Sequence, residues 1–162
     1  ITVDSEPGKG TTFKILLPVA TEKPEVEARR PDEVPLGNET ILFVDDEEAI
    51  AHMTGQILER LGYKVETETS PAAALELFQS QPDNFDLVIT DMTMPEMTGV
   101  KLSEKLKDIR PDIPVIISTG HSSLIDKERA KEMEIDAYVM KPIVKRDLAK
   151  TIRTVLANRQ AK

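Results

Sequence analysis

Between residues 40 and 157, short apolar segments alternate five times with stretches of helical periodicity, and this alternation constrains the fold most strongly. The apolar segments lack polar alternation, which is typical of strands buried on both faces of a parallel sheet. In the intervening stretches, apolar residues recur every three or four positions, the period of one helix face. We therefore predict an α/β fold, a five-stranded parallel sheet with helices on both faces. The predicted strands are 41–44, a short strand centred on Val65, 87–91, 115–117 and 138–140.

Cap and stop residues mark where the predicted helices begin and end. Gly62 follows the first helix as a C-terminal stop. Ser70 caps the second helix, with Pro71 at its first position, and Thr98 can cap the third. A further helix is expected at about residues 123–134. The closing helix has one apolar face, formed by Val144, Leu148, Ile152 and Val155.

The residues before this domain have a different character. Residues 1–17 form two extended runs around a Gly-rich turn, EPGKGT. Residues 18–39 combine four prolines with many charges, so we expect a linker with few contacts to the following domain. The regular domain is expected over residues 40–157, with residues 158–162 as a tail. Because the chain starts with Ile1 rather than Met, we expect it to be a fragment of a longer protein.

Composition excludes several classes of function. The net charge of −8 and an aromatic content of 4% argue against a nucleic-acid partner. No apolar run is long enough to span a membrane, and no signal peptide is present, so we expect no direct membrane contact. Cysteine is absent, which excludes disulfides and thiolate metal sites and fits a cytoplasmic location.

Polar side chains stand at the carboxyl ends of four predicted strands. Asp45 and Asp46 follow the first strand, and Asp91 ends the third. Thr119 follows the fourth strand and Lys141 the fifth. In open parallel sheets the ligand crevice lies at this edge, so we expect these side chains to meet there.

Three carboxylates, a lysine and a hydroxyl in one crevice can bind a metal ion and a phosphoryl group. Carboxylates gathered in one crevice repel one another unless a cation is present. Mg²⁺ favours carboxylate and phosphate oxygens and needs few protein ligands. A carboxylate beside such an ion can attack a phosphoryl group and form an acyl phosphate. A lysine and a hydroxyl stabilise the transition-state oxygens, so the five side chains suffice for aspartyl phosphorylation and hydrolysis.

Residues 40–157 resemble a response-regulator receiver domain. The resemblance implies the flavodoxin-like strand order 2-1-3-4-5 and phosphorelay signalling, in which the domain takes a phosphoryl group from a phosphohistidine. A histidine kinase or a histidine phosphotransfer domain would be the partner, and a second copy of the chain is a further candidate. The motifs that carry the resemblance are ILFVDDEE at 41–48, DLVITDMTMPEMTG at 86–99, PVIISTG at 114–120 and YVMKPI at 138–143.

The resemblance also implies a role for each site residue. Asp91 would be the phosphoacceptor, and Lys141 would contact the phosphoryl group. Asp46 would ligate Mg²⁺ directly, Asp45 would act mainly through water, and the backbone carbonyl of Thr93 would complete the protein ligands.

The same resemblance implies a phosphorylation switch. Thr119 and Tyr138 would form the switch pair, altering the surface of the fourth helix, fifth strand and fifth helix. A cis peptide bond is expected between Lys141 and Pro142.

Residues 1–19 resemble the last strands of a histidine-kinase ATPase domain, with Gly8 and Gly10 in its final glycine box. The order of kinase tail, linker and receiver is that of a hybrid histidine kinase. Because the rest of the nucleotide site is missing, we expect this segment alone not to bind ATP. The chain itself would be no enzyme beyond its own phosphorylation and hydrolysis, whereas the parent protein would be a kinase.

Three other functions use a similar fold or similar residues. A haloacid-dehalogenase-like phosphatase also uses Asp, Mg²⁺, Thr and Lys, but its nucleophile follows the first strand in an Asp-x-Asp motif. Here Asp91 follows the third strand and position 93 is Thr. A flavin-binding protein needs a phosphate loop after the first strand, where this chain has four acidic residues, 45–48. A pseudo-receiver that serves only for docking is opposed by the intact acidic set and Lys141.

Overall fold

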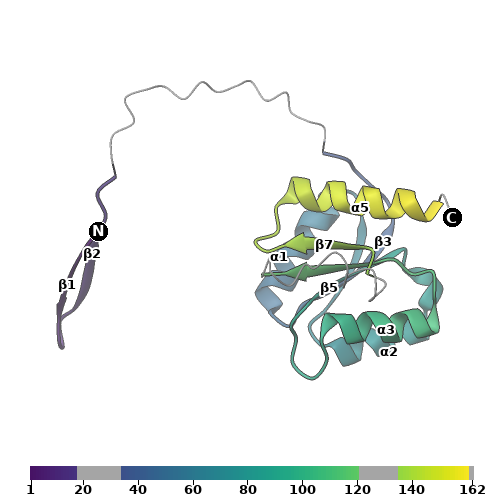
Figure 1. Cartoon of the computed structure of the whole chain (residues 1–162), viewed down its shortest axis with the longest axis horizontal. Coiled ribbons are helices and arrows are strands. Elements are labelled where there is room, and N and C mark those ends of the chain that lie inside the picture. The colour runs from purple at the N-terminus through teal and green to yellow at the C-terminus, as the bar shows by residue number, and fades with distance from the viewer. Residues whose placement is uncertain (18–33, 121–134, 161–162) are drawn as a thin grey trace. The chain divides into compact units, whose positions relative to one another are not determined.

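The computed structural model describes residues 1–17, 34–120 and 135–160 (Figure 1). The chain consists of two compact units, Ile1–Asp32 and Glu33–Lys162. The helix expected at residues 123–134 lies outside the described residues. In the parts of the chain that the structure describes, no helix is long and apolar enough to cross a membrane.

The first unit contains a β-hairpin. Strands β1 (Thr2–Glu6) and β2 (Gly10–Lys14) pair antiparallel, with Val3 opposite Phe13. Gly8 and Gly10 adopt φ values of 81° and 106°, which suit glycine and confirm the predicted turn. Val3 and Phe13 are 53% and 66% exposed. A two-stranded hairpin with an exposed apolar face is marginal in water, and residues 1–17, the described part of this unit, bury no core of their own.

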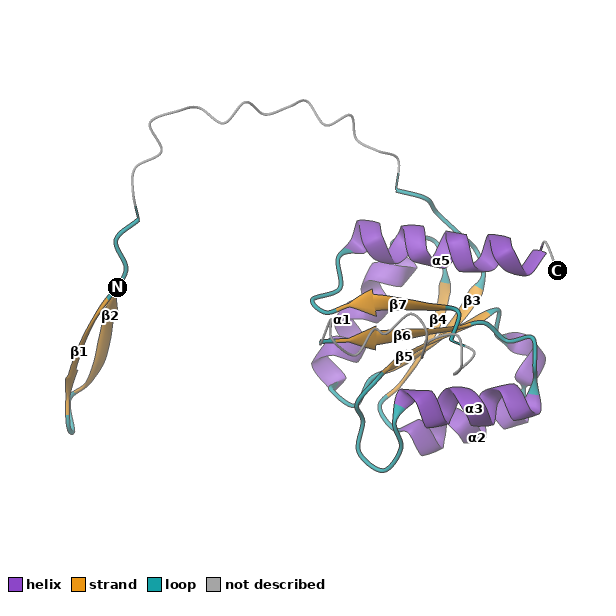
Figure 2. Cartoon of the chain, in the orientation of Figure 1, coloured by secondary structure: helices purple, strands orange, loops and turns teal. Residues whose placement is uncertain are grey.

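The second unit is built on a five-stranded parallel sheet with the order β4-β3-β5-β6-β7 (Figure 2). This order corresponds to 2-1-3-4-5 and confirms the predicted fold. The strand at Val65 is longer than its single apolar residue indicates, because β4 lies at the sheet edge, where its other four residues can be polar. The strands are β3 (Thr40–Val44), β4 (Lys64–Glu68), β5 (Leu87–Asp91), β6 (Val115–Thr119) and β7 (Ala137–Met140).

Helices cover both faces of this sheet (Figures 1 and 2). Ile41 and Phe43 point into a core shared with α1 and α5, whereas Leu42 and Val44 point into a core shared with α2 and α3. This division follows from the two-residue period of a strand. The helical elements are α1 (Glu48–Glu59), α2 (Pro71–Ser80), the 3-10 helix η1 (Pro82–Asn84), α3 (Gly99–Ile109) and α5 (Lys145–Gln160).

The predicted caps at Ser70 and Thr98 and the predicted stop at Gly62 are confirmed. Ser70 Oγ accepts a hydrogen bond from the Ala73 amide at 3.4 Å, and Thr98 Oγ1 accepts one from the Lys101 amide at 3.3 Å. Gly62 follows α1 with a φ of 95°, in the left-handed region. The C-terminal boundary differs from the prediction, because α5 continues to Gln160 and includes residues that we expected in the tail.

Residues 34–39, which we expected in the linker, pack on the sheet domain instead. Val34 contacts the core between the sheet and α1 and α5. The Gly37 amide donates to the Leu61 carbonyl at 3.0 Å, and the Glu39 carbonyl accepts from the Lys64 amide at 3.0 Å. We call residues 34–39 the strap. The expectation of few contacts is therefore wrong for the strap, because Val34 and two backbone hydrogen bonds hold it to the domain.

A long-range ion pair also fixes the strap. Arg153 NH1 on α5 donates to both carboxylate oxygens of Glu39, at 2.6 and 2.8 Å. Burial would raise the pKa of Glu39, but the hydrogen bonds and charge of Arg153 outweigh burial, and the pKa lies below its ordinary value. A Cβ atom at position 37 would overlap the ring of Tyr63, so only glycine fits there without a shift.

Candidate functional site

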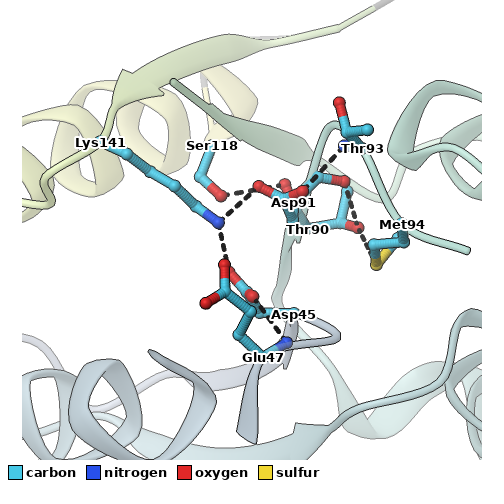
Figure 3. A network of polar contacts seen from close by, with 8 residues as sticks. All are labelled: Asp45, Glu47, Thr90, Asp91, Thr93, Met94, Ser118 and Lys141. Atoms are coloured by element: carbon cyan, nitrogen blue, oxygen red, sulfur yellow. Dashed lines mark hydrogen bonds and ion pairs between the residues drawn. The ribbon is translucent and has the colours of Figure 1, made fainter. Parts of the chain in front are cut away.

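The predicted polar residues gather at the carboxyl edge of the parallel sheet (Figure 3). Asp45 directly follows β3, Asp91 is the last residue of β5, and Thr119 is the last residue of β6. Lys141 directly follows β7. The strands are parallel and adjacent in the order β3-β5-β6-β7, so their ends bring together residues far apart in sequence.

The ammonium of Lys141 joins two carboxylates from different strands (Figure 3). Its Nζ atom lies 2.7 Å from Asp45 Oδ2 and 2.7 Å from Asp91 Oδ1. Asp45 is fully buried and Asp91 nearly so, whereas the Lys141 side chain is 21% exposed. Burial would lower the pKa of Lys141, but hydrogen bonds and attraction to both carboxylates outweigh burial and raise the pKa. Lys141 is therefore held as a cation beside both acids.

Backbone amides orient the other oxygen of each carboxylate. The Thr93 amide donates to Asp91 Oδ2 at 2.8 Å, and the Glu47 amide donates to Asp45 Oδ1 at 3.1 Å. Each acid is thus held between a lysine and an amide. Carboxylate oxygens fixed in this way favour a hard cation at the mouth of the site, and the Lys141 ammonium favours a phosphoryl group.

The remaining predicted metal ligands lie at the surface of the site. Asp46 and the Thr93 side chain are exposed. Among the described residues, no three acidic, His or Cys side chains are grouped to hold a metal ion. Lys141 instead supplies the positive charge between Asp45 and Asp91. The donor set still fits Mg²⁺ chemically, since it is made of hard oxygens and Mg²⁺ keeps several waters of its own.

The two predicted switch residues lie on neighbouring strands. Thr119 is buried at the end of β6, and its carbonyl accepts a hydrogen bond from the Lys141 amide at 2.8 Å. Tyr138 is half-buried on β7, opposite Ile117, and burial raises its pKa. The Lys141–Pro142 peptide bond is cis, which confirms the prediction. The structure therefore connects Thr119 and Lys141 through the main chain.

Two residues beneath Asp91 had no assigned role in the sequence analysis. Thr90 is fully buried, and its hydroxyl donates to the Asp91 carbonyl at 3.2 Å. Gly99 begins α3 and packs against the Asp91 main chain. A polar residue inside an otherwise apolar strand was the available signal for Thr90. Gly99 is the last residue of the motif at 86–99, but the sequence alone gave no physical reason why glycine is needed there.

Comparison with known proteins places this geometry in a family. Residues 41–153 match the family model described as the response regulator receiver domain. A receiver domain protein from Clostridium thermocellum has a similar structure, with a TM-score of 0.71 and 32% identity over 76% of this chain and 98% of that one. A CheY-like receiver domain protein from Methanospirillum hungatei gives a TM-score of 0.69 and 35% identity, covering 77% of this chain and 98% of that one.

Sensor kinases are also among the relatives. The chain is 33% identical to sensor kinase CckA of Brucella abortus, over 94% of the chain and 17% of that protein. It is 34% identical to the aerobic respiration control sensor protein ArcB of Escherichia coli, over 88% of the chain and 18% of that protein. The chain thus spans less than a fifth of these relatives' length. The family match, the sheet order and the shared fold lead to one conclusion: this chain belongs to the response regulator receiver domain family.

Proposed function

We propose that Asp91 is the phosphoacceptor of this receiver and takes its phosphoryl group from a phosphohistidine. Receiver domains work in two-component phosphorelays with histidine kinases or phosphotransfer proteins. The observation that supports the assignment is the Lys141 ammonium, which lies 2.7 Å from both Asp91 and Asp45. Asp91 is the acid that ends a central strand of the sheet, with its carboxylate held on both sides.

In the proposed transfer, an Asp91 carboxylate oxygen attacks the phosphorus of phosphohistidine. A P–O bond to Asp91 forms as the P–N bond breaks, and the released imidazole nitrogen takes a proton from water. Lys141 stabilises the charge that builds on the transferring oxygens, and the Thr119 hydroxyl can donate to the phosphoryl group. Hydrolysis of the acyl phosphate restores Asp91 and releases inorganic phosphate.

Mg²⁺ is the proposed cofactor, and it supplies positive charge to the phosphoryl oxygens when bound. Asp46 and Asp91 would hold it directly, Asp45 mainly through water, and Thr93 through its backbone carbonyl. Asp45 already has a cation partner in Lys141. Metal binding and the Lys141–Asp45 contact therefore act on the same carboxylate.

The proposed output is a change at Thr119 and Tyr138. A phosphoryl group adds about −1.5 to −2 charge units and three acceptor oxygens. Thr119 would turn its hydroxyl toward these oxygens, and Tyr138 would fill the space that Thr119 leaves. Beryllofluoride, a phosphoryl mimic, should then perturb the NMR signals of residues 135–141. A change confined to the neighbours of Asp91 would rule out this coupling, and Thr119→Ala should abolish the Tyr138 response.

We also propose that the chain comes from a cytoplasmic hybrid histidine kinase. The match to sensor kinase CckA covers 94% of the chain, more than the receiver occupies, so it includes part of the N-terminal segment. Residues 1–17 would be the end of the kinase ATPase domain, and the exposed apolar face of the hairpin fits a part of a larger domain that would cover this face. Residues 18–39 would form the linker, with the strap as its docked end. This chain's own chemistry would be limited to self-phosphorylation and hydrolysis.

The acceptor assignment is tested with acetyl phosphate and Mg²⁺, followed by intact mass and hydroxylamine trapping of the acyl phosphate. Wild-type protein should gain one phosphoryl group, and Asp91→Asn should gain none. Asp108→Asn changes an exposed acid on α3 and serves as the matched control, which should behave as wild type. A wild-type chain that gains no phosphoryl group would indicate a pseudo-receiver that only docks. Phosphorylation of the Asp91→Asn variant at the normal rate would overturn the assignment.

A further inference from the structure

The first residue of α3 touches the main chain of the proposed phosphoacceptor. A Cβ atom at position 99 would overlap the Asp91 carbonyl oxygen and lie 3.0 Å from the Asp91 carbonyl carbon. Real Cβ atoms do not approach a backbone this closely, so any side chain at position 99 must displace Asp91 or the helix. Gly99 is therefore the residue that lets α3 rest directly on the acceptor's peptide unit.

The need for glycine at this position is steric. The glycines of the described chain with φ in the left-handed region are Gly8, Gly10 and Gly62, so the backbone of Gly99 is one that any residue could adopt. Its amide donates to the Met92 carbonyl at 3.0 Å, which closes the loop between β5 and α3. The end of the loop at Gly99 is thereby held against its beginning at Asp91 and Met92.

Thr90 supports the same peptide unit from the face of the sheet that α3 covers. Side chains alternate along β5, so Thr90 points away from the Asp91 carboxylate and toward α3 and the loop. Its methyl carbon would lie 3.1 Å from a Cβ atom at position 99, and its hydroxyl donates to the Asp91 carbonyl. The hydroxyl also faces the sulfur of Met94 at 4.0 Å (Figure 3).

These contacts fix the acceptor's main chain, and the main chain fixes its carboxylate. The carboxylate must reach Lys141 on one side and the Thr93 amide on the other, at 2.7 and 2.8 Å. A displacement of the Asp91 carbonyl moves both of these contacts together. We propose that Gly99 and Thr90 are positioning residues for phosphoryl transfer to Asp91, an inference that rests on the function proposed above.

The first test is Gly99→Ala, with Gly37→Ala as its matched control. At position 37 the added methyl group would also clash severely, with the Tyr63 ring, far from the carboxyl edge of the sheet. Both variants should lose stability. At saturating acetyl phosphate and Mg²⁺, and per folded molecule, Gly99→Ala should be phosphorylated about 10²-fold more slowly, whereas Gly37→Ala should keep the wild-type rate. Equal losses in the two variants would show that the effect is only instability and would overturn the proposal.

The second test uses Thr90 and remains decisive if Gly99→Ala does not fold. Thr90→Val keeps the shape and removes the hydroxyl, whereas Thr90→Ser keeps the hydroxyl. Thr90→Val should slow phosphorylation at saturating donor roughly two- to tenfold, and Thr90→Ser should restore most of the rate. In the absence of metal and phosphodonor, Thr90→Val should also shift the NMR signal of the Thr93 amide, which reports the Asp91 carboxylate directly.

The outcomes distinguish the positioning role of Thr90 and Gly99 from the assignment of Asp91 as the phosphoacceptor. If Asp91→Asn abolishes phosphorylation but Thr90→Val has the wild-type rate and Thr93 signal, the positioning role is wrong and the acceptor assignment stands. If Asp91→Asn is phosphorylated normally, the acceptor assignment itself is wrong. Loss of rate in Thr90→Val with rescue by Thr90→Ser supports both.

Discussion

The Nζ atom of Lys141 lies 2.7 Å from Asp45 Oδ2, although the two residues are 96 positions apart in the sequence. Asp45 is fully buried, so Lys141 is the cation that balances a carboxylate removed from water. The same ammonium contacts Asp91, and one lysine therefore links three of the five parallel strands at their carboxyl ends.

Replacing Lys141 by Met should destabilise the domain without divalent cations, by up to about 3 kcal/mol, because a buried carboxylate loses its counter-charge. Urea unfolding measures the loss. Mg²⁺ should then raise the stability of Lys141→Met more than that of wild type, since the ion can replace the missing charge. The matched control is Lys105→Met on the exposed face of α3, which should leave both stability and the Mg²⁺ response unchanged. A Lys141→Met variant as stable as wild type in EDTA would contradict the balancing role.

The Glu39–Arg153 pair should give the strap a pH-dependent contribution. The folded-state pKa of Glu39 is lowered, so its contribution is fully present above the ordinary value of 4.5 and is lost as pH falls through the folded pKa. The pair is partly exposed, and we expect about 0.2–1 kcal/mol near neutral pH. Unfolding curves of wild type and Glu39→Gln should differ at about pH 7 and converge in acid. A difference that grows as the pH falls would show that the carboxylate is not the stabilising form.

The strap should be protected from hydrogen exchange, because the Gly37 amide donates to Leu61. Gly37→Ala should remove this protection, since the added methyl group meets the Tyr63 ring. Exchange measured by mass spectrometry on peptides covering residues 34–39 tests the prediction. Leu36→Ala is the control, because this side chain is 67% exposed and should affect protection little. Fast exchange at Gly37 in wild type would contradict the packing of the strap.

Arg110 should stabilise the junction of α2, η1 and α3. Its guanidinium donates to the carbonyls of Pro82 and Phe85 and lies 5.7 Å from the centre of the Phe78 ring. Arg110→Ala removes both of these hydrogen bonds and should cost about 1–3 kcal/mol in urea unfolding. Arg60→Ala, at an exposed position after α1, should cost little. Similar effects from both substitutions would mean that the buried contacts of Arg110 add nothing.

The strand-end rule explains why much of the site could be predicted from the sequence. Asp45, Asp91 and Lys141 each follow or end an apolar strand, and parallel strands bring such residues to one edge. Thr90 and Gly99 could not be assigned in this way. Their role depends on how closely α3 approaches β5, which is a matter of packing between segments and not of spacing within one.

The strap was mispredicted for a related reason. The stretch 18–39 as a whole has few large apolar side chains, and its prolines and charges favour a linker. The strap's contacts are made by Gly37, whose missing side chain leaves room for Tyr63, and by Glu39, whose partner Arg153 is 114 residues away. Single-sequence patterns carry no information about such pairs.

The position of the strap also shows at which end of the sheet the preceding residues join the receiver domain. The strap leads into Thr40, the first residue of β3, whereas Asp91 is the last residue of the parallel neighbour β5. The strap therefore enters at the amino ends of the strands, whereas the proposed acceptor lies at their carboxyl ends. A phosphodonor that docks at the carboxyl edge to reach Asp91 would therefore not meet the strap.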